Sequence, residues 1–290
     1  MALIAESSRP AQEKRGVLRV FVRRNPMIVL GIAVLIVVAL ISILAPIIAG
    51  DPMVMAPSHR LKGPSAEHWF GTDDLGRDIF ARTIYGARVS LVVGFSVAVL
   101  AIVFGLAIGL AAGYYRWLDG FIMRIMDGAM AVPSILLALA LVSLNKGGVG
   151  IVVIAIAIPQ VPSVARLVRS VVLSTRSQDF VDAAVVSGSR DLKIIRRHIL
   201  PSTVAPLIVL GTGAIASAIL TEAALSFLGT GVPPEIPTWG NMIASSRLFL
   251  ARAPWTIFFP GAFLTLVILA VNLLGDGLRD RLDPRLARRM

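Results

Sequence analysis

The sequence predicts an all-α membrane protein with six transmembrane helices and both termini in the cytoplasm. This prediction rests on the apolar content of the chain, on six long uncharged runs and on the distribution of cations between them. Of the 290 residues, 56% are hydrophobic and 16% charged, whereas soluble globular chains carry roughly 45 to 50% apolar and about 25% charged residues. A water-soluble protein of this length could not bury so much apolar surface, which excludes a soluble domain.

Six runs of the chain contain no Asp, Glu, Lys or Arg. A helix crosses the hydrocarbon with about 20 apolar residues, and each run is close to that length or longer. Spanning strands are about ten residues of alternating polarity, and the stretch 28–45 does not alternate. The six runs, and hence the expected spans, are 25–50, 89–115, 128–145, 147–165, 198–221 and 253–275.

These runs divide the chain into parts. The first run is longer than the core of a secretion signal, which has about 7 to 15 residues, so it is expected to remain as an anchor. The expected parts are a basic N-terminal cytoplasmic segment (1–24), the first transmembrane helix (25–50), a periplasmic loop (51–87), a five-helix core (88–275) that includes a cytoplasmic loop (175–201), and a cytoplasmic tail (276–290).

The Lys and Arg residues gather in alternate gaps between the runs. If the N-terminus is cytoplasmic, twenty of the 28 cations fall in cytoplasmic segments and seven in outer segments, with Arg88 at a boundary. Cytoplasmic segments of membrane proteins carry an excess of Lys and Arg. Both termini are therefore expected inside.

Several classes of function are disfavoured by what the sequence lacks. The net charge of +11 does not indicate nucleic-acid binding, because the cations lie in short gaps rather than on one basic face. Without cysteine there is no disulfide, thiolate metal site or Cys nucleophile. No phosphate-binding G-x-x-x-x-G-K-[ST] loop occurs, so the chain is expected to be neither an enzyme nor a nucleotide binder. His59, His68 and His198 are not at ligand spacing and no carboxylate cluster joins them, so no metal site is expected.

The second span carries a stripe of small residues. Gly105, Gly109 and Gly113 recur at four-residue spacing, which places them on one helix face where a second backbone can approach closely. Packing inside the same subunit is the preferred interpretation, and a contact between two subunits is the alternative.

Three residues in the spans are candidates for a translocation path. Pro159, closely followed by Pro162, is expected to interrupt the fourth span as Pro133 interrupts the third. Broken helices in transport proteins often line a water-filled path, but a plain kink is the preferred interpretation. Glu222 follows the apolar stretch 203–221. A carboxylate there is either a functional group inside the membrane or a group in the outer interfacial water.

The cytoplasmic loop 175–201 is longer than a simple connection between two spans. Thr175 followed by Gln178 is a capping-box pattern, and Gly188 suits a helix stop, so one helix is expected over 176–187.

A second short helix is expected after the glycine. Ser189 can cap it, Asp191 lies in its first turn, and it should end before Pro201. Ala183 and Ala184 give the first helix a small-residue face suited to the groove of another protein. An amphipathic helix lying on the membrane surface is the alternative.

The outer loop contains a charged cluster that follows two aromatic residues. It is either a docking or plug surface or a loop held by internal salt bridges and N-caps, and the second interpretation is slightly preferred. Trp239, in another outer segment, is expected to anchor the chain at the membrane interface rather than stack on a ligand. The cluster comprises Asp73, Asp74, Arg77, Asp78 and Arg82, preceded by Trp69 and Phe70.

The cytoplasmic loop resembles the EAA loop of ABC-type importer permeases, in which E-A-A is followed by three residues, G, nine residues and I-x-L-P. Asp182 replaces the usual Glu and His198 the usual Ile, so the coupling role is not assigned to His198. The residues that carry the resemblance are Asp182, Ala183, Ala184 and Gly188, and the ending His198, Ile199, Leu200 and Pro201.

Further motifs resemble the C-type subunit of dipeptide and oligopeptide permeases, and together with the loop they cover residues 25–285. They stand in the same order as in that family, which makes the chain similar to binding-protein-dependent transport permeases. They are HWFGTDDLGRDI (68–79) with YGARVSL (85–91), LSFLG (225–229) and GDGLRDRLDP (275–284).

The resemblance implies a MetI-like permease fold in the bacterial cytoplasmic (inner) membrane. It implies a heterodimer with a paralogous permease subunit, two ABC ATPase subunits that bind the ATP, and a periplasmic solute-binding protein, with no cofactor in this chain. The implied ATPase-coupling residues are Asp182, Ala183, Ala184, Gly188, Leu200 and Pro201.

The cargo implied is a di- or oligopeptide, with nickel chelates, opines or glutathione as alternatives on the same machinery. An ion-coupled secondary transporter is a different class, and it should show charged pairs within the spans. A passive membrane scaffold would not need the helical cytoplasmic loop.

Overall fold

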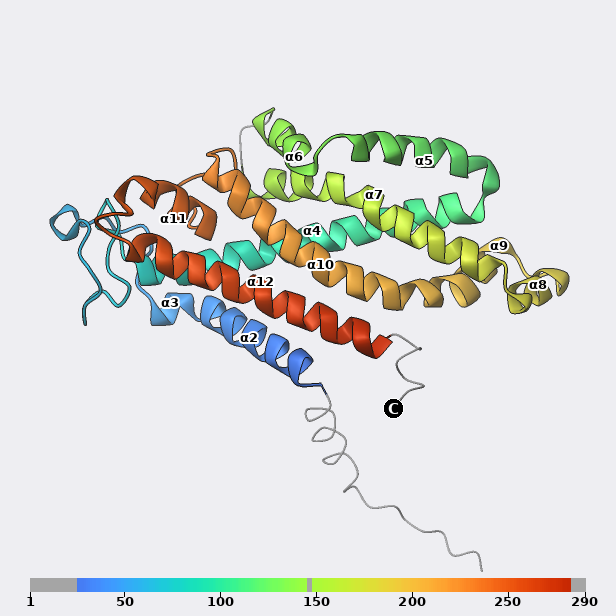
Figure 1. Ribbon diagram of the computed structural model, residues 1–290, viewed down its shortest axis with the longest axis horizontal. Coiled ribbons are helices and arrows are strands. Elements are labelled where there is room, and N and C mark those ends of the chain that lie inside the picture. Colours follow the sequence, from blue (N-terminus) through green and yellow to red (C-terminus); the bar gives the residue numbers. More distant parts are fainter. Residues whose placement is uncertain (1–24, 145–147, 283–290) are drawn as a thin grey trace, which may run out of the picture.

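The computed structural model describes residues 25–144 and 148–282, which form an elongated bundle of helices (Figure 1). The expected segment 1–24 and the end of the tail from residue 283 lie outside the described residues. Five helices in the described part are long and apolar enough to cross a membrane. They are α2 (Pro26–Ile43), α4 (Ile79–Tyr114), α7 (Val149–Arg176), α10 (Leu200–Phe227, which α9 precedes without a break) and α12 (Trp255–Leu282).

Shorter helices connect the long ones and cover their ends. The bent pair α5 and α6 makes a sixth candidate span. The shorter elements are α3 (Ala45–Ile48), α5 (Arg116–Ala131), α6 (Ser134–Ser143), α8 (Asp179–Val186), α9 (Asp191–Ile194), α11 (Trp239–Ser246), two 3₁₀ turns (Pro57–His59 and Arg247–Phe249) and a π-turn (Ile195–Ile199).

The two ends of the bundle differ in what they carry (Figure 1). The start of α2 and the end of α12 point toward the end that holds α8 and α9, although both stop short of it. The segment between α3 and α4, together with α11, lies at the opposite end. The first span therefore begins, and the last span ends, on the same side of the bundle. An even number of crossings produces this arrangement.

Helices α4 and α7 pack directly on one another through the predicted glycine stripe. A Cβ atom on Gly109 would lie 2.6 Å from the carbonyl oxygen of Ala165, and one on Gly113 would lie 2.7 Å from Cβ of Val172. The helices can therefore approach this closely only because the glycines have no side chains. The prediction that the stripe packs within the subunit is confirmed.

The third expected span, 128–145, is not a single helix. Helices α5 and α6 meet at an angle of 85°, and Pro133 lies at the break. Proline has no N–H to donate and disfavours helical backbone in the residue before it, and Val132 is accordingly extended. The uncharged run 128–145 also leaves out most of α5, because this helix contains charged residues. Two of them, Asp119 and Asp127, pair with Arg169 (2.6 Å) and Arg166 (2.7 Å) of α7.

The fourth span is not broken at Pro159, which excludes the broken-helix interpretation and leaves the preferred one, a plain kink. Pro159 and Pro162 both lie inside the continuous helix α7. A long apolar helix packed against its neighbours tolerates the loss of a backbone hydrogen bond at proline. The fourth span also extends beyond the uncharged run, to Arg176.

The ends of the first and second spans also differ from the expected ones. Helix α2 ends at Ile43, and α3 follows it within the expected first span. Helix α4 begins at Ile79, inside the expected outer loop 51–87. The charge criterion placed this boundary too late because Arg82 is a buried residue of the helix, with its Nε 3.8 Å from Oδ2 of Asp73.

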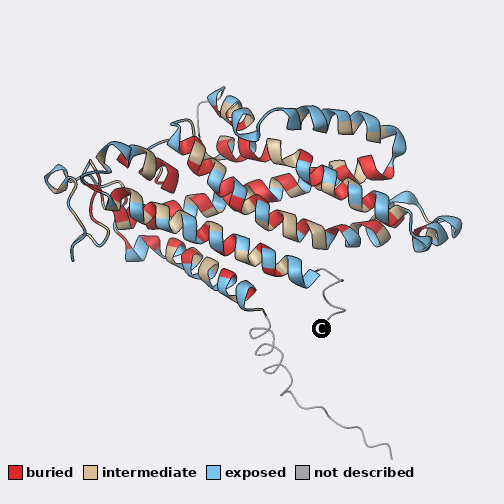
Figure 2. Cartoon of the chain, in the orientation of Figure 1, coloured by how far each residue is buried: buried red, intermediate tan, exposed pale blue. Residues whose placement is uncertain are grey.

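Burial follows the helix faces, with buried residues where helices meet and exposed ones on the outside (Figure 2). The outward residues of α2 and α3 are apolar, and Leu30 and Ile47 are 56% and 83% exposed. In a chain that spans lipid, such surfaces face acyl chains rather than water.

The glycine stripe predicts the effect of adding a single methyl group. Gly109→Ala should lower the stability of the full chain by about 1–3 kcal/mol, because the new Cβ overlaps the α7 backbone. Gly213→Ala is the matched control, since a Cβ there meets nothing within 4 Å, and alanine favours helix by up to about 1 kcal/mol. Thermal unfolding of the purified chain in detergent measures both. Equal midpoints for the two variants would contradict the role given to the stripe.

Candidate functional site

The motif around Asp182 forms a bent helical element, residues 179–199, which we call the elbow. It comprises α8, a turn at Gly188, α9 and the π-turn that leads into α10. Asp182, Ala183 and Ala184 lie on α8. Leu200 and Pro201 are the first residues of α10, directly after the elbow. The six residues that the resemblance implies for coupling are thus held in one short element and the helix that continues from it.

The expected boundaries of both helices in this segment are wrong. Helix α7 continues to Arg176, with the buried Thr175 inside it, and α8 begins only at Asp179. Gln178 occupies the N-cap position of α8 without a side-chain hydrogen bond to the helix. Packing of the last turns of α7 against α4 extends the helix past the capping pattern.

The second helix does not end before Pro201 either. Helix α9, the π-turn and α10 follow one another without a break from Asp191 to Phe227. Pro201 lies in the first turn of α10 and has no N–H to donate. The π-turn that precedes it shifts the hydrogen-bond register locally, so the chain remains helical where a simple stop was expected.

Gly188 ends α8, as predicted. Its φ angle is +75°, a left-handed conformation that glycine adopts without the cost that a Cβ brings. Its N–H donates to the carbonyl oxygen of Val185 at 2.9 Å, and the N–H of Ser189 donates to that of Ala184 at 3.1 Å. These bonds satisfy carbonyl groups at the end of α8 and turn the chain sharply toward α9.

The elbow is attached to the bundle through its apolar inner side. Val181, Ile194 and Ile199 are at most 2% exposed and pack in one cluster with Val168 and Val172 of α7. These two valines belong to the face of α7 that meets the glycine stripe. The elbow therefore rests on the α4–α7 contact.

A polar bracket adds to this attachment. The hydroxyl of Tyr114, at the end of α4, donates to Oδ1 of Asp191 in α9 at 2.8 Å. Nη1 of Arg176, at the end of α7, donates to the backbone oxygen of Tyr114 at 2.6 Å. Three helix ends are thus tied at one point. No sequence pattern indicated this role for Tyr114 or Arg176, because neither belongs to a spacing motif.

The outer side of the elbow carries exposed apolar side chains that have no partner in the described chain. Val186 is 88% exposed and Leu192 is 76% exposed. Asp182 and Ala183 are also exposed beside them, and Asp182 lines a groove of about 550 Å³ between α8 and the start of α5. Exposed apolar side chains on a firmly held element are typical of a surface that binds another protein.

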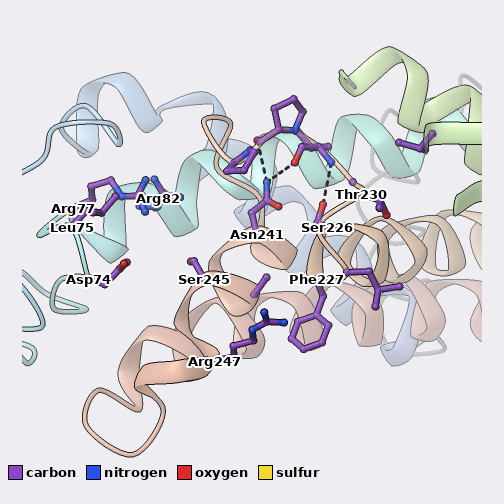
Figure 3. Close-up of a pocket in the computed structure, with 18 of the residues that line it drawn as sticks. Asp74, Leu75, Arg77, Arg82, Ser226, Phe227, Thr230, Asn241, Ser245 and Arg247 are labelled. Carbon is purple, nitrogen blue, oxygen red and sulfur yellow. Dashed lines mark hydrogen bonds between the residues drawn. The ribbon is translucent and has the colours of Figure 1, made fainter. Parts of the chain in front are cut away.

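A cavity of about 670 Å³ lies at the opposite end of the bundle (Figure 3). Its wall is formed by the end of α6, the end of α10, the loop after it, α11 and the segment that leads into the first turn of α4. Charged side chains of both signs, among them Asp74, Arg77 and Arg247, line it. The cavity is therefore polar enough to take a hydrated or charged molecule.

The loop after α10 owes its shape to two polar residues. Nδ2 of Asn241 donates to the carbonyl oxygens of Val232 and Pro233, at 2.9 and 3.2 Å (Figure 3). The N–H of Val232 donates to Oγ of Ser226 at 3.3 Å. Gly229, with φ +80°, ends α10 and begins the loop. The LSFLG motif thus forms the end of a helix that also forms a cavity wall.

Of the two alternatives for Glu222, the structure excludes the outer interfacial water, because the side chain is buried; it does not line the cavity either. It is fully buried and accepts a hydrogen bond from Oγ of Ser226 at 2.7 Å. Oγ of Ser90 in α4 lies 3.5 Å from its other oxygen. Glu222 joins α10 to α4 behind the cavity wall, and Pro159 and Pro162 do not line the cavity.

The charged outer cluster is held by internal contacts. Nε of Arg77 donates to Oδ2 of Asp73 at 2.6 Å, and Oδ1 of Asp78 accepts the N–H of Ala81 at 2.9 Å as the N-cap of α4. The preferred interpretation of internal salt bridges and caps is therefore confirmed for these residues. Asp74, Arg77 and Arg82 also line the cavity.

Two expectations about outer residues are wrong. Trp239 is fully buried and donates its Nε1–H to the backbone oxygen of Thr83 at 3.0 Å, so it is a core residue rather than an interfacial anchor. His59 and His68 are not isolated, because the fold brings them together beside Glu67. Their separation in sequence concealed this contact.

Residues 101–288 match the family described as "Binding-protein-dependent transport system inner membrane component". The chain is 58% identical to a probable peptide ABC transporter permease protein of Sinorhizobium fredii, over 98% of this chain and 97% of that protein. It is 49% identical to the dipeptide transport system permease protein DppC of Alkalihalophilus pseudofirmus, over 91% and 88%.

The chain belongs to this family of inner membrane components. A glutathione transport system permease protein of Pectobacterium atrosepticum is 41% identical over 92% of this chain and 90% of that protein. A chain of the inward-facing MetNI methionine ABC transporter has the same fold, with a TM-score of 0.58 at 15% identity, over 71% of this chain and 98% of that one. The expected MetI-like permease fold and the multi-pass location in the inner membrane are confirmed.

The bracket at Tyr114 predicts how firmly the elbow of this permease is held. Tyr114→Phe removes the hydroxyl that donates to Asp191, and a hydrogen bond to a charged group contributes about 1.5–3 kcal/mol. Amide hydrogen exchange over residues 179–199 should become faster, while exchange in the middle of α4 stays unchanged. Tyr115→Phe is the control, because the Tyr115 ring only contacts that of Tyr114 edge to face. Equal exchange in both variants would contradict the bracket.

Proposed function

We propose that this chain is the permease subunit of an ATP-driven importer that moves di- or oligopeptides across the cytoplasmic membrane. The observation that carries the proposal is the elbow, which is fixed to the ends of α4 and α7 on its inner side and presents Val186 and Leu192 on its outer side. A transport subunit driven by separate ATPases needs such an element, because force applied at a partner surface must reach the spans.

The elbow is the proposed docking element for one of two ABC ATPase subunits. Asp182, Ala183 and Ala184 would lie in a groove of the ATPase, with small side chains that permit close approach. Gly188 supplies the turn that directs α8 away from α9. ATP would be bound by the ATPases and not by this chain, which has no phosphate-binding loop in its sequence.

The orientation that this role requires agrees with the charges. The elbow must face the cytoplasm, and Arg190, Lys193, Arg196 and Arg197 lie in or beside its second half. An excess of Lys and Arg favours the cytoplasmic side. Both termini would then also be cytoplasmic, and the cavity beside α11 would face the periplasm and a solute-binding protein.

A paralogous permease subunit would complete the translocation path. Helix α5 contacts the rest of the described bundle on one side only, and Trp117 and Phe121 on it are 79% and 69% exposed. Its exposed outer face and its bend at Pro133 suit a helix that lines a path between two subunits. Alternating access requires the path to open to one side at a time.

Peptide cargo is supported by the two relatives named for peptide or dipeptide transport. Glutathione is the second candidate, because the glutathione permease is 41% identical over nearly the whole chain. The cavity of about 670 Å³, with carboxylate and guanidinium groups in its wall, suits a zwitterionic molecule with separated charges.

Reconstitution tests the transport class. Vesicles that contain this chain, its partner permease and the ATPases should take up peptide only with ATP and a binding protein. Vesicles without the ATPases should show no uptake, even with an ion gradient. Uptake driven by a gradient in this chain alone would overturn the proposal in favour of a secondary transporter. Competition of labelled dipeptide with glutathione then distinguishes the two cargo candidates.

The turn at Gly188 gives a sharper prediction for coupling. Gly188→Val forces a β-branched residue into a left-handed conformation that costs roughly 1–2 kcal/mol even for an unbranched one, so α8 should lose its direction and the ATPases should no longer co-purify. Gly188→Asn is the matched variant, because asparagine tolerates this conformation. It should retain ATPase binding and transport.

Membrane insertion of both Gly188 variants should be normal, since a Cβ at this position meets nothing within 4 Å. Co-purification of the ATPases with the valine variant at the wild-type ratio would count against the elbow as the coupling element.

A further inference from the structure

The segment between α3 and α4 brings three ligand-type side chains to one point. His59 follows the residues that start a 3₁₀ turn, and Glu67 and His68 come from the next stretch of chain. One donor atom from each lies within 4.8 Å of the others. The chain has only three histidines and no cysteine. In the described structure, two of these three histidines lie side by side here.

His68 is oriented by a residue that is itself fixed. Its Nδ1 lies 2.8 Å from Oδ2 of Asp78. The other oxygen of Asp78 accepts the N–H of Ala81 at 2.9 Å as the N-cap of α4. A carboxylate on Nδ1 holds the proton on that nitrogen and leaves the lone pair of Nε2 available, which is the usual arrangement of a metal-binding histidine.

The second imidazole faces that lone pair. Nδ1 of His59 lies 3.1 Å from Nε2 of His68, with the rings nearly perpendicular at 78°. Two Zn–N bonds of roughly 2.0–2.1 Å at a tetrahedral angle separate the nitrogens by about 3.3 Å. The backbone of His59 is also held, because the hydroxyl of Thr72 donates to its carbonyl oxygen.

We propose that His59, Glu67 and His68 bind one Zn²⁺ ion, with Asp78 orienting His68 without touching the metal. Imidazole nitrogen and carboxylate oxygen are ligands that Zn²⁺ prefers. Glu67 is exposed and turns the histidine pair into a three-ligand set. Three protein ligands would leave a fourth position for water or for a group from a docked protein.

The ion would crosslink the segment that forms part of the cavity wall. It would join the 3₁₀ turn to residues 67–68 and, through Asp78, to the start of α4. Asp74 and Leu75, which line the cavity, lie between these attachment points in sequence. Zinc would therefore order the loop on the side where cargo is received, an effect independent of the transport class proposed above.

The competing explanation is a plain hydrogen bond in which Nδ1–H of His59 donates to Nε2 of His68. It accounts for the 3.1 Å distance without a metal, and it gives Glu67 no role. The two explanations make different predictions: only the metal site predicts that the chain binds a metal ion and that Glu67 contributes to the affinity.

The test uses the full-length chain with an affinity tag that contains no histidine. The chain is stripped with a chelator and titrated with Co²⁺, whose visible absorption reports tetrahedral coordination, and then with Zn²⁺ in competition. We expect one ion per chain and a rise in the unfolding temperature with Zn²⁺. His59→Ala and Glu67→Gln should each weaken binding by at least about 10-fold, and Asp78→Asn, which keeps a capping oxygen, by about 10- to 100-fold.

His198→Ala is the matched control, since His198 lies in the π-turn at the other end of the bundle, and it should bind Zn²⁺ as the unaltered chain does. Absence of stoichiometric binding in the unaltered chain would overturn the proposal. So would equal affinity in the unaltered chain and Glu67→Gln, which preserves the shape of the side chain and decides the matter if His59→Ala fails to fold.

Discussion

The close contact between α4 and α7 is the constraint on which the rest of this permease depends. Glycines at four-residue spacing on α4 meet valines at four-residue spacing on α7, and the pairs Gly109–Val168 and Gly113–Val172 leave no room for a side chain on the glycine. In lipid, apolar surface gives helices little reason to associate, so close backbone packing supplies much of the attraction. Both helices run in the same direction, and their ends therefore arrive together.

The elbow and the cavity are built on this pair from opposite ends. At one end, Tyr114 and Arg176 finish α4 and α7 and hold the elbow. At the other, α4 begins at its Asp78 cap, where the charged segment folds against the cavity. Glu222 ties α10 to α4 from inside the bundle. A displacement of the elbow would thus act on helices that also shape the cavity, without any separate connecting element.

The sequence predicted what depends on local pattern and missed what depends on tertiary contact. Apolar runs located the long helices, four-residue spacing identified the stripe, and the conformational freedom of Gly188 identified a turn. Charge-based boundaries failed where an ion is paired inside the bundle, as at Arg82. The capping pattern at Thr175 did not start a helix, because packing extends α7 to Arg176. The contact between His59 and His68 could not be predicted, because it depends on how the outer segment folds. Coupling roles for Asp182 and its neighbours stay predictions.

Helix α9, the π-turn and α10 form one continuous helical segment, so a rotation at the elbow would be transmitted along α10. Helix α10 has 28 residues, which gives it a length of about 42 Å at 1.5 Å per residue. If the elbow pivots and α10 follows as a rod, a tilt of only about 5° shifts its far tip by roughly 4 Å over that length. The residues at that tip, Ser226 to Gly229, line the cavity. A small rotation at the elbow would therefore change the shape of the cavity at the opposite end of the bundle.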